Sequence, residues 1–416
     1  MLTRSTMRKV WAVMALAAAC CPAGRAEASG YLLYDQSAEA MGRASAVSAG
    51  TREPAAIWYN PANLSYVPEW RVSATGMVYV VNLRFAAAGS GEETRADTTV
   101  SPAGAVFAAG PITDRLHAGL GVYSGYGLGS TWPSGWVGRT ASISSELTTY
   151  SINPTLAYRL SDTFSVGAGY DLVRAAADNL TGLPVPIGGT VRVGGATWGH
   201  GANVGMLARI VPDRFHAALS WRSSVALTID GRADFDPASP EFLRELPDQG
   251  GSAKVKFPDI VTAGFMARTA GDVRFGFDAS YVRWSVYDKQ VLEFERTAPA
   301  TSTFNFHDVV ILRAGVDGPT GVSGLRLRTG MMYEQKPSRP EYLNPSLPDA
   351  HILDFAAGAG WIGPWWKADA GYVLGLNWPT TATGGKEGPE GTYRTVSHVM
   401  TVTFTARLGA SKASGW

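Results

Sequence analysis

The stretch Val273-Arg-Phe-Gly-Phe-Asp-Ala-Ser-Tyr281 changes side-chain character at every residue. Val, Phe, Phe, Ala and Tyr fall on one face of an extended chain. Arg274, Gly276, Asp278 and Ser280 fall on the other face, because successive side chains of a strand point in opposite directions. Alternation sustained over the whole stretch predicts a β-strand with one apolar and one polar face.

Comparable alternation recurs along the chain in about fourteen segments, an even number as in bacterial single-chain barrels. They lie near residues 70–84, 99–110, 115–126, 139–160, 163–178, 196–211, 214–233, 254–269, 272–287, 304–317, 324–334, 351–361, 364–377 and 394–408. The connections alternate between tight turns, such as 159–162, and long Gly/Pro-rich loops, such as 235–253. Short turns on one side and long loops on the other are typical of outer-membrane barrels.

The N-terminal residues have the three parts of an export signal. Arg4, Arg8 and Lys9 are followed by an apolar run over 10–21 and by the small-x-small site Ala26-Glu-Ala28. This order predicts a cleavable secretory signal over residues 1–28. An alternative remains open, because Leu16-Ala-Ala-Ala-Cys20 loosely resembles a lipoprotein box that would place a lipid on Cys20.

The composition excludes several classes of protein. Only 17% of the 416 residues are charged, below the roughly 25% that is usual for soluble domains. A net charge of +1 argues against a nucleic-acid partner. Beyond the signal, no apolar stretch approaches the length of a membrane-spanning helix. The two cysteines, Cys20 and Cys21, lie within the signal, so we expect neither disulfides nor a thiol metal site.

These observations predict an all-β protein, a 14-stranded antiparallel transmembrane β-barrel in the outer membrane. An exported chain without spanning helices can cross a membrane only as a closed barrel. We assign the signal to 1–28, an N-terminal hatch or plug to 29–69, the barrel to 70–408 and a C-terminal extension to 409–416. A soluble β-sandwich or propeller is the alternative, since both also alternate.

Residues 29–69 do not alternate, and their small residues favour one or two short helices. Tyr31, Leu32, Ile57 and Trp58 make the segment too apolar to stay disordered. We therefore expect a plug folded into the lumen; a disordered tail or a periplasmic adaptor are the alternatives.

Several short motifs occur in a fixed order along the predicted strands: Gly42-Arg43-Ala44, Asn60-Pro61-Ala62, Ser124-Gly125-Tyr126-Gly127-Leu128, Trp221-Arg222-Ser223, Tyr281-Val282-Arg283-Trp284-Ser285 and Leu347-Pro348-Asp349. With them the chain resembles the FadL-type family of outer-membrane transporters of long-chain fatty acids and aromatic hydrocarbons. The resemblance implies a barrel closed by an N-terminal hatch, with ligand leaving sideways at a kinked third strand. Gly125 and Gly127 give that kink a physical basis, since glycine in a strand often marks a bend.

The resemblance also implies basic residues that bind a fatty-acid carboxylate inside the barrel. Arg174 on the fifth strand and His307 on the tenth are the candidates. The alternation of the fifth strand would instead turn Arg174 outward, as an arginine near lipid headgroups. A histidine at 307 would bind a carboxylate weakly near neutral pH, which favours neutral hydrocarbons slightly.

The predicted function is therefore passive uptake of hydrophobic molecules, with outer-membrane lipid and the barrel assembly machinery as partners of a monomer. We expect no cofactor and no metal, because no metal-ligand spacing, Gly-x-Ser-x-Gly or phosphate loop occurs. The two alternatives are a general diffusion porin, and an outer-membrane lipid hydrolase that would use Ser220 and His216. Plug residues 29–69 argue against the porin.

Overall fold

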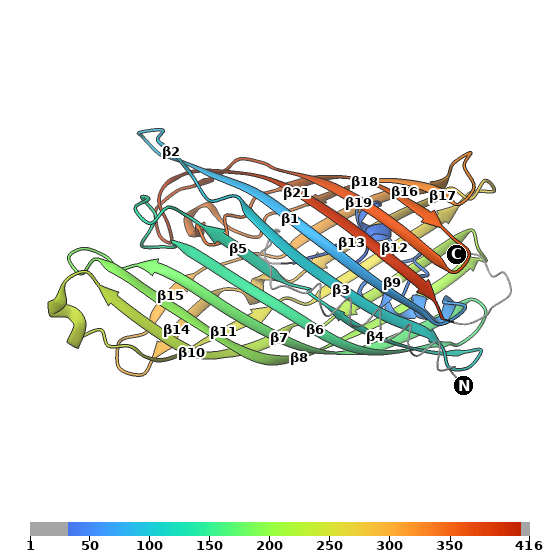
Figure 1. Ribbon diagram of the computed structural model, residues 1–416, viewed down its shortest axis with the longest axis horizontal. Helices are drawn as coiled ribbons and strands as arrows, with labels where there is room; N and C mark the ends of the chain where they lie inside the picture. Colours follow the sequence, from blue (N-terminus) through green and yellow to red (C-terminus); the bar gives the residue numbers. More distant parts are fainter. Residues whose placement is uncertain (1–31, 409–416) are drawn as a thin grey trace.

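The computed structural model describes residues 32–408, so the predictions for the export signal 1–28 and the extension 409–416 lie outside the described residues. Fourteen antiparallel strands close into a single barrel, which confirms the predicted fold class (Figure 1). The seam joins the first strand to the last, from Arg71 opposite Arg407 to Ala87 opposite Gly391. This closure excludes the sandwich and propeller alternatives.

Several barrel strands are interrupted and are therefore numbered in two parts. The elements are α2 (Ala38–Met41), α3 (Ala56–Tyr59), η2 (Pro61–Tyr66), β1 (Arg71–Ala87), β2 (Glu93–Arg95), β3 (Thr99–Pro111), β4 (Leu116–Tyr123), β5 (Gly127–Thr131), β6 (Ser144–Arg159), β7 (Phe164–Gly182), β8 (Gly189–Val211), β9 (Phe215–Arg222), β10 (Val225–Pro237), η3 (Pro240–Arg244), β11 (Gln249–Phe257), β12 (Ile260–Arg268), β13 (Arg274–Val282), η4 (Trp284–Val286), β14 (Lys289–Phe294), β15 (Ala300–Thr303), β16 (Val309–Pro319), β17 (Leu325–Glu334), η5 (Pro340–Tyr342), β18 (Ile352–Ile362), β19 (Trp366–Asn377), β20 (Thr380–Ala382) and β21 (Gly391–Arg407). None of the helices within residues 32–408 is long and apolar enough to cross a membrane.

The alternation of side chains places apolar groups outside the barrel and polar groups inside it. On β13, Phe275, Phe277 and Tyr281 are exposed on the outer face. Asp278 and Ser280 of the same strand are buried in the interior. The outer face therefore suits contact with lipid, while the inner face offers hydrogen-bonding groups to whatever fills the lumen.

The segment 32–70 runs inside the barrel and fills the half toward which β21 runs (Figure 1). We call residues 32–70 the hatch. It contacts strands around the ring: the Ala38 amide donates to Thr403 of β21, and the Val47 amide to Asp278 of β13. On a further side, the Ser165 hydroxyl of β7 donates to the Ala62 carbonyl. The hatch is thus tied to strands far apart in the sequence.

Glycines of the inner wall receive the hatch backbone at close range. A Cβ on Gly330 of β17 would lie 2.5 Å from the carbonyl carbon of Arg43. A Cβ on Gly358 of β18 would lie 2.9 Å from the Cα of Gly42. Distances below 3.0 Å to backbone leave no room for a side chain, so these positions need glycine for packing rather than for conformation.

The third strand is broken, as the resemblance implies. Its first part, β4, ends at Tyr123, and its second part, β5, begins at Gly127. The second strand, β3, pairs with β4 only from Ala105 to Pro111. Within the described residues, β3 residues 99–104 keep a ladder only with β1, while β5 pairs with β6. The wall therefore lacks a stretch of ladder between its second and third strands.

Candidate functional site

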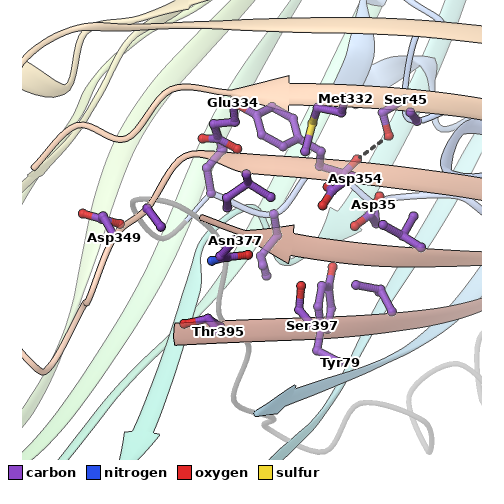
Figure 2. A pocket seen from close by; sticks show the side chains of 18 of the residues that line it. Asp35, Ser45, Tyr79, Met332, Glu334, Asp349, Asp354, Asn377, Thr395 and Ser397 are labelled. Carbon is purple, nitrogen blue, oxygen red and sulfur yellow. Dashed lines mark hydrogen bonds between the residues drawn. The ribbon is translucent and has the colours of Figure 1, made fainter. Parts of the chain in front are cut away.

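An internal cavity lies between the hatch and the strands β17, β18, β19 and β21 (Figure 2). The space between its lining atoms, including the part open to solvent, is about 880 Å³. Most of the lining is apolar and comes from both the hatch and the wall: Leu32, Leu33, Ala44, Met332, Leu347, Ile352, Val373 and Val399. A mostly apolar lining with a few polar groups suits the hydrocarbon part of a small ligand.

Four of the polar side chains that line this cavity are acidic. Asp35, Glu334, Asp349 and Asp354 line it, together with Asn377 and the hydroxyl groups of Thr395 and Ser397. No lysine, arginine or histidine of the part of the chain that the structure describes is among the lining residues. Burial raises the pKa of the Asp35 carboxyl to about 6, although Arg313 acts to lower it.

A basic residue that sequence reasoning missed, Arg313, lies behind the aromatic ring of Tyr34. Its guanidinium carbon is 3.9 Å from the ring centroid, and its Nη1 donates to the Ser280 hydroxyl over 2.9 Å. It borders a second, smaller cavity that Arg222 also lines. Arg313 shares its inward face on β16 with buried Ile311, so alternation on that strand could have identified it.

The start of the hatch separates the cavity from the broken third strand. Leu32 and Leu33 line the cavity, and the same residues contact the break. Leu32 forms a β-bridge with Tyr126, and the Leu33 amide donates to the Gly125 carbonyl over 3.0 Å. Next to them, Gln36 Nε2 donates to the Ser124 carbonyl over 2.7 Å.

Buried polar side chains fix the end of β4 next to the break. The Tyr123 hydroxyl donates to Asp171 of β7 over 2.6 Å, and Asn153 Nδ2 donates to the same carboxylate over 2.8 Å. Arg222 pairs with Asp171 and donates from Nη2 to the Trp58 carbonyl of the hatch over 3.2 Å. Because the network joins wall to hatch, the kink and the hatch hold each other in place.

Comparisons with known proteins agree with this architecture. A family model described as outer membrane protein transport protein (OMPP1/FadL/TodX) matches residues 19–407. The chain belongs to this family. Membership makes it an outer-membrane transport protein and not an enzyme, which removes the lipid hydrolase alternative.

Individual relatives of this FadL-type chain are distant but cover most of its length. A long-chain fatty acid transport protein of Salmonella typhi is 24% identical, over 85% of this chain and 88% of the relative. A solved FadL homologue of Pseudomonas aeruginosa has a TM-score of 0.84 at 17% identity, covering 92% of this chain and 100% of its own. The Ralstonia pickettii toluene transporter TbuX has a TM-score of 0.69 at 15% identity, covering 90% and 100%. At these identities the structural likeness shows the fold.

In this FadL-type chain, the motif Asn60-Pro61-Ala62 connects two parts of the hatch with each other and with the wall. Asn60 caps η2: its Oδ1 accepts from the Ala62 amide, and Pro61 occupies the first turn. The Nδ2 of Asn60 donates to the carbonyls of Ser48 in the hatch and Met206 in β8, both over 3.1 Å. Asn60 is fully buried, so its side chain links three segments that the sequence separates.

A buried ion network fixes the other side of the hatch. Lys367 of β19 pairs with Glu39 and Glu53 of the hatch. Its Nζ also lies 3.2 Å from Asp369, and the Arg43 guanidinium is 2.8 Å from Glu39. Glu39, Glu53 and Asp369 lie close enough together to hold a metal ion. The ammonium of Lys367 already pairs with all three carboxylates and supplies the positive charge.

The two predicted ligand-binding residues do not line the cavity. Arg174 lies on the outer face of β7, with its guanidinium carbon 5.6 Å from the ring centroid of the exposed Trp198. β6 and β7 stay in register on both sides of Arg174, so no bulge turns it inward. His307 is exposed between β15 and β16. Neither residue lines the cavity, and the position of Arg174 fits the alternative of an interfacial arginine near lipid headgroups.

Proposed function

We propose that the protein takes up hydrophobic molecules by passive, binding-driven diffusion, with exit sideways through the break in the third strand. One observation carries the proposal: hatch residues Leu32 and Leu33 line the cavity and also bind the break at Gly125 and Tyr126. Movement of this short segment would connect the cavity with the wall. Relatives named for long-chain fatty acids and for toluene support a hydrophobic substrate.

Sideways exit suits the physical chemistry of such a substrate. Backbone groups without a hydrogen-bond partner are costly in lipid, so a stretch of wall without ladder bonds must be covered by other groups. In the proposal, the start of the hatch covers it and moves aside when substrate passes. A hydrophobic ligand that leaves through the wall enters the membrane directly. It then avoids water at the periplasmic mouth, where each re-exposed methylene costs about 0.8 kcal/mol. In the proposal, outer-membrane lipid receives the substrate, and one chain inserted by the barrel assembly machinery suffices.

A reversible lock between hatch and kink tests the proposal. Residues paired across an antiparallel bridge have the Cα separation that a disulfide needs, and the predicted mature chain has no other cysteine. The variant Leu32→Cys/Tyr126→Cys should therefore lose uptake of a radiolabelled hydrophobic substrate when oxidised. Reduction should restore uptake.

The matched control places the same lock within the wall. Ala263→Cys/Ala279→Cys joins β12 to β13, whose residues already pair in the ladder, and should transport equally when oxidised or reduced. Undiminished uptake by the oxidised Leu32/Tyr126 variant would show that this hatch segment does not need to move.

The hatch supports this proposal over the general diffusion porin. A porin needs an open lumen, whereas the backbone of Arg43 lies directly on the wall at Gly330. Removal of residues 33–66 should convert the barrel into a large open pore in planar bilayers. If conductance did not change, the porin alternative would gain.

A further inference from the structure

The main cavity combines an apolar lining with a group of carboxyl side chains (Figure 2). Figure 2 shows Glu334, Asp354 and Asp35 around the same space, whose lining also includes Leu33 and Val373. They come from β17, β18 and the hatch. Acidic groups from three separate elements therefore meet around one apolar chamber.

Glu334 is the most buried of these groups and has an unused acceptor. Only 1% of the residue is exposed, and its Oε1 has no hydrogen-bond partner among the described residues. A buried acceptor without a donor carries the full cost of its lost hydration. This oxygen therefore points to a donor that a ligand would supply.

Nearby positive charge does not balance the carboxyl groups. Arg313 acts electrostatically on Asp35, Glu334 and Asp354. It does not line the cavity, and its guanidinium stacks on Tyr34. Because one guanidinium lies near several carboxyl groups, the cavity has more carboxyl groups than basic groups around it.

We infer that this cavity selects hydrophobic amines, with the ammonium head on Glu334 and Asp354 and the hydrocarbon on the apolar lining. An ammonium group donates three charge-assisted hydrogen bonds, which are about twice as strong as neutral ones. A carboxylate head has no proton to donate to Glu334 Oε1 and would be buried beside other carboxyl groups in the same space. An alcohol donates one hydrogen bond without charge, so it should bind with intermediate affinity.

The inference rests on the proposed function, because it names the substrate class of the same cavity. Binding is measured by native mass spectrometry of the full chain in detergent, with octylamine, octanol and octanoate as probes of equal chain length. We expect octylamine to bind about tenfold more tightly than octanol, because this is the gain in affinity that one hydrogen bond to a charged group gives. Octanoate should bind least tightly.

Two variants separate the carboxyl groups from general attraction of amines to the protein. Glu334→Gln/Asp354→Asn keeps the shape of the side chains and should bring octylamine down to the affinity of octanol. The control Asp162→Asn makes the same chemical change on an exposed turn and should keep the preference. Unchanged heat-modifiable mobility on gels verifies that both variants fold.

Each other outcome has a defined meaning. Octanoate binding ahead of octylamine, with loss of that binding in Arg313→Met, would overturn the inference and indicate a carboxylate site behind Tyr34. Preference for octylamine that survives in Glu334→Gln/Asp354→Asn would also overturn it. Binding of none of the three probes would contradict the proposed function itself.

Discussion

Arg43 of the hatch lies with its backbone directly on Gly315 of β16, where a Cβ would come within 2.4 Å of the Arg43 carbonyl oxygen. The same hatch residue sends its side chain to Glu39, so its backbone and its guanidinium are both fixed. A small shift of the wall at Gly315 must therefore move the hatch.

The first prediction follows from this contact. Gly315→Val should displace the hatch, because overpacking of a fitted interface costs about 1–3 kcal/mol. Planar bilayer recordings should show more frequent or larger openings than the wild type. Gly321→Ala, on a turn where no atom lies within 4 Å of the new Cβ, should leave conductance unchanged.

The second prediction concerns the buried ion network. Lys367→Met keeps most of the side-chain volume but leaves Glu39, Glu53 and Asp369 without their shared ammonium. Breaking a buried ion pair by removing one partner costs about 3–5 kcal/mol. Hydrogen exchange of hatch amides should accelerate strongly at constant pH. Lys386→Met, at an exposed lysine, should not change it; equal exchange in the two variants would contradict the role of Lys367.

The third prediction tests the hatch motif. Asn60→Ala removes the cap of η2 and two donors to buried carbonyls, those of Ser48 and Met206. Loss of a cap costs about 1 kcal/mol. Each of the two lost hydrogen bonds costs about 0.5–1.5 kcal/mol, because the Ser48 carbonyl still accepts from Asn63 Nδ2 over 2.6 Å. Hatch peptides should lose protection from exchange, while peptides of the seam between β1 and β21 keep theirs. Full protection of the hatch in this variant would remove any role for the motif.

The fourth prediction concerns pH. Burial raises the pKa of Asp35 to about 6 against the opposing effect of Arg313. Burial, followed by the charge of Glu39, raises the pKa of Glu53 to about 7, against Lys367. A carboxyl whose pKa is higher in the seated hatch than in water stabilises the seated form as the pH falls. Seating should therefore strengthen as the pH falls from about 7 toward 5, and channel openings should become rarer.

Glu39 does not titrate between pH 7 and pH 5, so it does not oppose this effect. Burial acts to raise its pKa, but Lys367 and Arg43 hold it well below the usual value, so its contribution is lost only in stronger acid. Asp35→Asn should reduce the difference in open probability between pH 5 and pH 8. If openings became more frequent on acidification, the assigned direction would be wrong.

Alternation along each strand predicted the barrel, because the period of a strand is local and lipid allows only apolar groups outside. The break at residues 124–126 was implied by the family resemblance, and Gly125 and Gly127 gave it a physical basis. The same rule turned Arg174 outward, and the structure agrees with the rule rather than with the ligand role that the resemblance suggested.

The contents of the lumen could not be predicted in the same way. The pairs Lys367 with Glu39 and Asp278 with Val47 join residues that are hundreds of positions apart. Such contacts depend on how the hatch sits in the closed ring, which no local pattern contains. The acidic cavity has the same origin, since Asp35 and Asp354 meet only after closure.

The stretch 99–104 of β3, which pairs with β1 but not with the third strand, has a further consequence for association between barrels. A free strand edge in a membrane could pair with the edge of a neighbouring chain. The stretch contains Pro102, which has no amide hydrogen to offer to another strand. Ala103 and Gly104 add little side-chain surface for a second strand to pack on. These residues therefore make pairing with a neighbouring chain at this edge unfavourable, as the proposed sideways exit would require.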